Sequence, residues 1–443
     1  MATDTAGQQL LAGRDRCNDT PKAPIEHELT AVSPVVPTTT SPRLRRLVAG
    51  IAASSAGDGL LVVALPLLAV RLTTQSLLIA GIAVAGGLPW LLVGLPSGAL
   101  ADRVERSTLV LAVDLARAAA IGALALAVLL GRSSIAELYV AAFLIGAGET
   151  AVVAATKAAI PELAAPSELI RVNGRVNAVE TAGVEFAGPA LGGLVFSIRS
   201  WLPLAGDALS YAASALLLRS AMAGAGARRD PRRTSVAADM RAGLAWFGSS
   251  GALRVLATIV ASFAFCQAAV LAVLVIYATR ILHLHGAAYG VMLSVAALGD
   301  VAASLLAGRV HRRLGPFVTI LLAGALAGGA YVLLGSTARP YVAVAALALE
   351  AAGSSLGNVT TLTLRQRIIP LELFGVVSNA FRMCVLGMVP LGALAGGLLT
   401  GSLGTRPTFV IAGILQLAVL ALMATPLRLV AITGPEAGST LHR

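Results

Sequence analysis

Charged residues are scarce in this chain, since only 12% of its 443 residues are Asp, Glu, Lys or Arg. An ordinary soluble domain carries about 25% charged residues, so a soluble protein of this size would lack the polar surface to cover itself. Aromatic residues make up only 4% of the chain, too few for a surface on which nucleic-acid bases stack. The three cysteines form neither a CxxC pair nor a disulfide framework, and we expect no cysteine chemistry.

Sequence patterns of nucleotide and metal sites are missing as well. The chain has no phosphate-binding loop of the GxxxxGK[ST] type, so ATP is not expected to be its energy source. His283 and His285 have no acidic or cysteine residue close by in the sequence that would complete a metal site. We therefore expect no metal, no cofactor, no catalytic residue and no enzymatic activity.

Long apolar runs are what the sequence does contain: 57% of its residues are hydrophobic and its mean hydropathy is +0.84. A helix needs about 20 apolar residues to cross a bilayer, and in lipid a helix satisfies its own backbone hydrogen bonds. The composition predicts an all-α membrane protein embedded in a lipid bilayer. We place twelve transmembrane helices at residues 47–70, 77–100, 108–130, 137–158, 173–197, 202–221, 254–278, 287–308, 316–335, 340–361, 376–398 and 406–426.

The net charge of +11 is spread over the connections between these runs rather than gathered on one domain. When the connections are assigned alternately to two sides, one side carries six arginines and the other carries 21 basic residues. Cytoplasmic loops of membrane proteins carry the excess of Lys and Arg. We therefore predict that the basic side is cytoplasmic and that both termini of this multi-pass protein lie there.

Composition also divides the chain into five stretches. Residues 1–42 are predicted to be a disordered cytoplasmic tail, and residues 427–443 a second cytoplasmic tail. Residues 43–221 and 254–426 hold six apolar runs each. Residues 222–253 form a cytoplasmic linker in which Met240, Leu244 and Phe247 recur at helical spacing, so it is predicted to include an amphipathic helix along the membrane surface. A plain linker is the alternative.

Two short motifs occur twice, once in each group of six runs. The stretch LADRVER (100–106) returns as LAGRVHR (306–312), at an offset of 206 residues. The stretch GPALGG (188–193) returns as GALAGG (392–397), at an offset of 204. Two six-helix pseudo-repeats in tandem, related by an axis along the membrane normal, are a known plan of secondary transporters.

These motifs resemble those of the major facilitator superfamily, and within it those of a bacterial branch that exports drugs such as macrolides and the siderophore enterobactin. The signature after helix two of that family, roughly G-x-L-A-D-R-x-G-R-[KR], corresponds to residues 98–107, with Glu105 and Ser107 as departures. In the second half, residues 363–397 are similar to the branch, with Val376 as a departure. Helix five resembles the drug-export motif of the family, with its small residues in place at Gly183, Gly188, Pro189, Gly192 and Gly193.

The resemblance implies a cytoplasmic gate formed by Gly98, Asp102, Arg103 and Arg106. Asp102 would face the backbone N–H groups at the start of helix eleven, which attract a carboxylate. Arg103 and Arg106 would brace this latch, and Asp102→Asn should cripple transport without preventing insertion. The alternative is a hydrophilic turn that only sets topology. On helix five, glycines four residues apart lie on one face and permit close helix packing. This packing would suit an interface at which the two halves rock. The alternative is close packing without motion.

Ionisable residues inside apolar runs cost about 2.5–3.5 kcal/mol each and usually mark function or a pair. In the family, helices one, four, seven and ten line a central cavity, so the resemblance places Asp58, Glu149 and Glu350 there. Glu185 on helix five and Arg382 on helix eleven complete the candidate set. Removal from water favours the protonated carboxyl, so such an acid can exchange a proton for a cationic substrate. The alternative is that the acids satisfy one another or pair with an arginine such as Arg382.

Three other charged residues are interpreted structurally. Asp114 and Arg117 lie three apart on one face of helix three and are predicted to form an ion pair. Asp207, close to the outer end of helix six, is predicted to lie at the membrane interface.

The sequence as a whole predicts a secondary active transporter in the bacterial plasma membrane. Its partners would be protons and a small-molecule substrate, with no nucleic acid, and we expect a monomer. By family resemblance it would export an amphipathic small molecule or antibiotic in exchange for protons, by alternating access. The alternatives are a siderophore or metabolite exporter or an importer of the same fold, and a membrane sensor or scaffold that does not transport.

Overall fold

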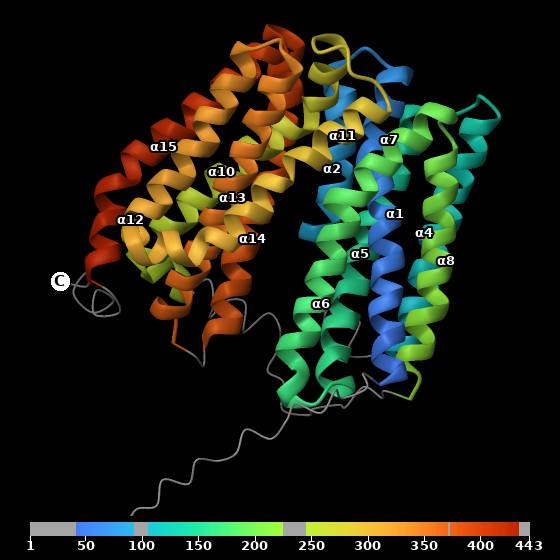
Figure 1. The fold of residues 1–443 in the computed structure, drawn as a ribbon, viewed down its shortest axis with the longest axis horizontal. Helices are drawn as coiled ribbons and strands as arrows, with labels where there is room; N and C mark the ends of the chain where they lie inside the picture. The colour runs from blue at the N-terminus through green and yellow to red at the C-terminus, as the bar shows by residue number, and fades with distance from the viewer. Residues whose placement is uncertain (1–40, 93–104, 225–244, 371–372, 434–443) are drawn as a thin grey trace, which may run out of the picture. The chain divides into compact units, whose positions relative to one another are not determined.

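The computed structural model of the protein describes residues 41–92, 105–224, 245–370 and 373–433. These residues form helices joined by short turns, with no β-strand among them (Figure 1). Nine of the described helical segments are long and apolar enough to cross a membrane, and the apolar helix Ser76–Leu92 is shorter. The predicted all-α membrane fold is confirmed, and these segments are consistent with the predicted twelve crossings.

The helices before residue 223 are called the first set. Their starts follow local rules: the Ser41 hydroxyl accepts a hydrogen bond from the Leu44 N–H at 3.2 Å, and a capping box of Ser134 and Glu137 opens the fourth predicted crossing. The set comprises α1 (Pro42–Leu72), α2 (Ser76–Leu92), α4 (Arg106–Leu129), α5 (Ile135–Leu163), α6 (Leu169–Thr181), the π-helical turn η2 (Ala182–Ala187), α7 (Gly188–Ile198) and α8 (Leu202–Met222).

The helices after residue 250 are called the second set. They are α10 (Gly251–Arg280), α11 (Ala287–Ala296), α12 (Leu298–Ser336), α13 (Pro340–Ile368), α14 (Phe374–Leu403) and α15 (Thr405–Thr433). Helices α11 and α12 together contain the predicted eighth and ninth crossings. Helix α12 breaks at Gly315, where φ is 74°, a backbone conformation that glycine adopts without strain. Pro316 follows the break and starts the second part of the helix.

The predicted divisions of the chain are only partly within the described residues. The predicted N-terminal tail lies outside them up to residue 40, and α1 begins at Pro42. Helix α15 runs to Thr433, and the rest of the predicted C-terminal tail lies outside. Met240 and Leu244 of the predicted amphipathic helix in the linker lie outside the described residues. Residues 245–249 are helical, and the ring of Phe247 packs edge-on against the ring of Phe381, with 6.4 Å between the ring centres.

Packing within each set is dense, and a few helices join the two sets. In the first set α1 packs against α7 and α8, α4 against α5 and α8, and α2 against α5. In the second set α12 packs against α13 and α15, and α10 against α14 and α15. Contacts between the sets run from α2 to α14 and from α7 to α11 (Figure 1).

Candidate functional site

A cavity of about 370 Å³ lies between helices of both sets. Its walls come from α1, α2, α5 and Val184 of η2 in the first set, and from Leu271 and Ala272 on α10 of the second. Most lining residues are apolar, and the lining includes two carboxyl groups, those of Asp58 and Glu149. No basic residue is among the described residues that line it. Two of the three acids predicted to face a central cavity therefore lie in one.

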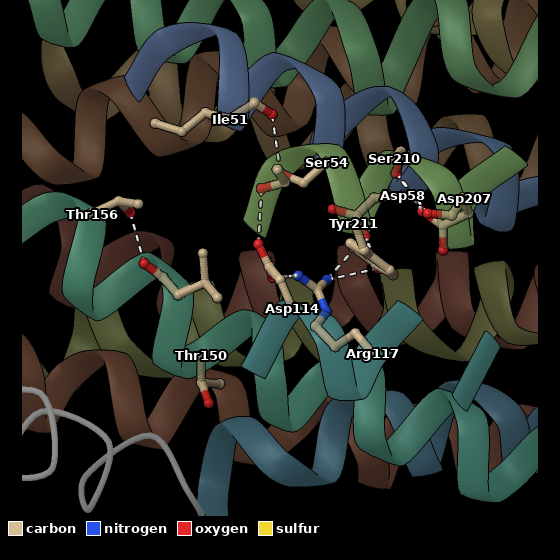
Figure 2. Close-up of polar contacts among 12 residues, drawn as sticks. Ile51, Ser54, Asp58, Asp114, Arg117, Thr150, Thr156, Asp207, Ser210 and Tyr211 are labelled. Carbon is tan, nitrogen blue, oxygen red and sulfur yellow. Dashed lines mark hydrogen bonds and ion pairs between the residues drawn. The ribbon is translucent and has the colours of Figure 1, made fainter. Parts of the chain in front are cut away.

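Asp58 lies at the boundary between the cavity and a buried polar cluster. Its carboxylate accepts a hydrogen bond from Arg117 Nη2 at 3.1 Å and another from the Tyr211 hydroxyl. Arg117 comes from α4 and Tyr211 from α8, so the contact joins three helices (Figure 2). The partner of this acid is thus Arg117 rather than Arg382.

Arg117 is the centre of that cluster. Its Nη1 donates to Asp114 at 3.3 Å, which confirms the ion pair predicted from their spacing. Its Nη2 also donates to the Tyr211 hydroxyl at 2.8 Å, and the guanidinium lies 3.9 Å from the centre of the Tyr211 ring. Asp114 accepts a further hydrogen bond from the Ser214 hydroxyl at 2.8 Å. Every member except Asp58 is almost fully buried.

Asp207, which was predicted to lie at the membrane interface, is buried inside the protein beside this cluster. Its exposed fraction is 0%, and its Oδ1 accepts a hydrogen bond from the Ser210 hydroxyl at 3.0 Å. The residue is close to the start of α8, but that end of α8 is covered by α1, where Gly57 leaves room for the carboxyl group. The burial of this carboxyl group within the protein could therefore not be predicted from its position near a helix end.

A regular polar stripe on α8 includes three residues that the sequence analysis missed, Ser210, Tyr211 and Ser214. Asp207, Ser210, Tyr211 and Ser214 follow the spacing i, i+3, i+4 and i+7, which places them on one helix face. Each of them bonds within the cluster or to a member of the stripe. A polar stripe with this period in an otherwise apolar run was the available signal.

Glu149 occupies the cavity wall on α5. The Trp90 side chain on α2 lies beside its carboxyl group. The guanidinium of Arg382, on α14 of the second set, lies 5.1 Å from the centre of the Trp90 ring, within cation–π range. The two predicted residues Glu149 and Arg382 are therefore both neighbours of Trp90.

Glu350 lies outside the lining of this cavity. It is 6% exposed, between α10, α12 and α13, and its Oε1 accepts hydrogen bonds from Gln267 at 2.9 Å and from the Tyr331 hydroxyl at 3.0 Å. Both donors are uncharged, in contrast to the arginine beside Asp58. Glu185 is exposed within the π-helical turn η2 and is not a lining residue either.

Most of the predicted gate motif cannot be placed, since Gly98, Asp102 and Arg103 lie outside the described residues. Arg106 is buried, and its Nη1 pairs with Glu162 at the end of α5 at 2.6 Å. The two departures from the family signature are paired with each other in this structure. The Ser107 hydroxyl donates to Glu105 at 2.6 Å, and this contact lowers the pKa of Glu105, which precedes α4.

The glycine motif predicted on helix five lies in η2 and α7, and its two faces contact different helices. A Cβ atom added to Gly188 or Gly192 would stand 2.7 Å from backbone atoms of α1, and one added to Gly183 would stand 2.8 Å from Ser55. A Cβ atom on Gly193 would instead stand 3.1 Å from the Cα of Gly290 on α11. Only the face with Pro189 and Gly193 therefore meets the second set.

The repeated motif in α14 makes the corresponding contacts. Cβ atoms added to Gly392 and Gly396 would stand 2.9 and 2.8 Å from α-carbons of α10, the helix that corresponds to α1. A Cβ on Gly397 would meet α2 of the first set, 3.1 Å from the Cα of Leu77. The sequence repeat is thus also a repeat of contacts, which accords with two equivalent halves.

Features of other protein classes were sought in the same residues. Among the described residues, no group of three or more His, Cys, Asp or Glu side chains could hold a metal ion. The stretch GSSLG (353–357) has the letters of the hydrolase pattern GxSxG, but it lies inside α13 rather than at a strand-to-helix turn.

Comparison with known proteins agrees with this architecture. A search of curated proteins found no match. Among solved structures, a bacterial homologue of the human lysosomal transporter Spinster, inward-facing and unoccupied, is 15% identical, with 88% of this chain and 97% of that chain covered and a TM-score of 0.67. A bacterial homologue of the iron transporter ferroportin, inward-facing, is 18% identical, with 88% and 98% covered and a TM-score of 0.68.

The nucleoside transporter NupG is 10% identical, with 88% of this chain and 99% of that chain covered and a TM-score of 0.67. At such identities these likenesses show a shared fold. The sequence itself matches a family description over residues 47–389. The chain belongs to the Major Facilitator Superfamily of membrane transporters.

Proposed function

We propose that the protein is a secondary transporter that exports an amphipathic, cationic small molecule in exchange for protons. The observation that carries this proposal is the composition of the cavity wall. Apolar side chains of α1, α2, α5 and α10 would cover the lipophilic part of a substrate, and the carboxylates of Asp58 and Glu149 would hold its cation.

The same two acids give a physical basis for proton exchange. A carboxylate surrounded by apolar side chains is costly as an unpaired anion, so it binds a proton or a cation. A proton and a cationic group compete for the same carboxylate, and the binding of one releases the other. Asp58 forms an ion pair with Arg117, whereas Glu149 forms no ion pair within the described residues, so Glu149 is the stronger candidate for the exchanging acid.

Contacts between the two sets suggest which side of the cavity is closed. Arg280 Nη2 donates to the Thr74 carbonyl oxygen at 3.3 Å, and the Ala287 N–H donates to the Ser197 hydroxyl at 2.9 Å. All four residues lie beside connections that the basic-residue pattern assigns to the outside. We infer an inward-facing state, in which the cavity receives substrate from the cytoplasm.

Alternating access would follow from rocking of the two sets, which we equate with the predicted halves at residues 43–221 and 254–426. The pivots would be the close approaches of Gly193 to α11 and of Gly397 to α2, because small residues let the backbones slide without side-chain obstruction. The predicted latch at Asp102 would close the cytoplasmic side in the opposite state.

The test is accumulation of a fluorescent lipophilic amine in inside-out vesicles under an imposed pH gradient. We expect an uncoupler to abolish uptake, and Glu149→Gln to reduce it at least tenfold. A neutral analogue of the amine should not compete with the amine for uptake. Glu137→Gln is the matched control, because Glu137 is an exposed acid on the same helix and glutamine preserves its capping box. Accumulation that persists with the uncoupler would reject antiport, and equal transport by both variants would reject the role of Glu149.

A further inference from the structure

One oxygen atom of the Asp207 carboxyl group has no partner. Oδ1 accepts the Ser210 hydroxyl at 3.0 Å, but Oδ2 is buried and makes no hydrogen bond within the described residues. The whole residue is 0% exposed. An unbonded oxygen of a buried carboxylate anion is far more costly than an unbonded hydroxyl of the neutral acid. The geometry of Asp207 therefore favours a bound proton.

The charges around Asp207 lead to the same conclusion. The groups that face it from the neighbouring helices are Asp58 on α1, Asp114 and Arg117 on α4, and Tyr211 on its own helix (Figure 2). Fully ionised, this cluster would hold three carboxylates and a single guanidinium. The guanidinium already donates to Asp58 and to Asp114, so Asp207 is the acid with no cation of its own.

Asp207 is not among the residues that line the cavity. A Cβ atom at Gly57 would overlap both the Asp207 carboxyl oxygen and the Ser210 hydroxyl, so the two helices touch at this point. Asp58, the next residue along α1, is a cavity-lining residue and is partly exposed. The two acids are therefore close neighbours, with Asp58 partly open to the cavity and Asp207 fully buried beside it.

We propose that Asp207 holds a permanent proton that does not exchange during transport, and that it thereby leaves Asp58 as the only exchanging acid of the buried cluster. With Asp207 neutral, the cluster carries one negative charge in excess, which one proton or one cationic group at Asp58 would balance. The second part of this inference rests on the proposed exchange of protons for a cation, whereas the protonation of Asp207 does not.

Infrared spectroscopy of the full-length protein in lipid tests the protonation directly. We expect a carbonyl band of a protonated aspartic acid at neutral and mildly alkaline pH, identified by its shift after incorporation of isotope-labelled aspartate. Asp207→Asn should remove this band, and Ser210→Ala should shift its frequency without removing it, because the hydroxyl donates to the carboxyl group. Absence of the band in the unaltered protein, or its persistence in Asp207→Asn, would overturn the proposal.

Proton release tests whether Asp207 exchanges its proton. A lipophilic amine is added to the purified protein in weakly buffered solution, and released protons are counted with a pH indicator. Asp207→Asn should release as many protons per bound amine as the unaltered protein, whereas Asp58→Asn should release fewer. Reduced release from Asp207→Asn would show that this acid exchanges, against the proposal. If no variant releases protons, the antiport function fails, yet the infrared band still decides whether Asp207 is protonated.

Discussion

Replacement of Arg117 by alanine offers the most direct test of the buried cluster. The substitution removes the single guanidinium that donates to Asp58, Asp114 and Tyr211, and leaves the two acids without a cation. Asp114 is fully buried and Asp58 is mostly buried, so water cannot replace the lost donor. We expect the protein to insert into the membrane but to lose much of its stability.

The magnitude can be worked from these contacts. Removal of one partner from a buried ion pair costs about 3–5 kcal/mol, because the remaining charge is left uncompensated. The guanidinium also lies 3.9 Å from the centre of the Tyr211 ring, a cation–π contact worth about 0.5–2 kcal/mol. Protonation of the two acids limits the total, so we expect a loss of about 3–5 kcal/mol at neutral pH, and a smaller loss in acid.

The assay is denaturant titration of the purified protein in mild detergent, followed by helical circular dichroism. Arg199→Ala is the control, since Arg199 is exposed and donates only to the carbonyl of its own neighbour, and it should change stability by less than about 0.5 kcal/mol. Adding Asp58→Asn and Asp114→Asn to the Arg117→Ala variant should recover stability, because no unpaired charge remains. A single variant as stable as the control, or a triple variant no better than the single, would refute the reasoning.

Smaller perturbations elsewhere also have definite expected outcomes. Gly188→Ala would place a methyl group 2.7 Å from the carbonyl carbon of Gly59, so denaturant titration should show a loss of about 1–3 kcal/mol. Gly174→Ala, which meets open space in α6, should be neutral or stabilising by up to about 1 kcal/mol. Two neighbouring hydroxyls lower the pKa of Glu105 from 4.5, so its contribution is present above that value and is lost as the pH falls through the lower folded pKa. The stability difference from Glu105→Gln should therefore close in acid, and a difference that widens would contradict this. Ser197→Ala removes the acceptor at the start of α11 and should increase labelling of a cavity cysteine by an impermeant reagent added outside.

Helix positions were predictable from the sequence because each crossing is a run of about 20 apolar residues. The pair of Asp114 and Arg117 was predictable for a similar reason, since a spacing of three fixes two side chains on one helix face. The contact of Arg117 with Asp58 was not, because it joins residues 59 positions apart whose meeting depends on how α1 and α4 pack. One-dimensional spacing carries no information on that packing.

The residues of the candidate site were likewise predictable only in part. Glu149 was placed in the cavity through the family resemblance, and the structure gives it a lining position. Its neighbour Trp90 was not predicted as part of the site, because nothing in the sequence links a tryptophan on α2 to Arg382 on α14. The burial of Asp207 could not be predicted from its position near a helix end, because burial depends on the neighbouring helix, and α1 covers that end of α8.

The π-helical turn at Ala182–Ala187 has a consequence for how this protein tolerates changes in length. An ordinary helix turns by about 100° per residue, and a π turn accommodates one residue more than an α turn. Deletion of a single residue within the turn would convert it to an α turn and leave Gly188 and Gly192 facing α1 and Gly193 facing α11. The same deletion inside α7 would rotate every later side chain by about 100°. This crossing should therefore tolerate the loss of one residue within the π turn better than the loss of one residue in the regular helix that follows.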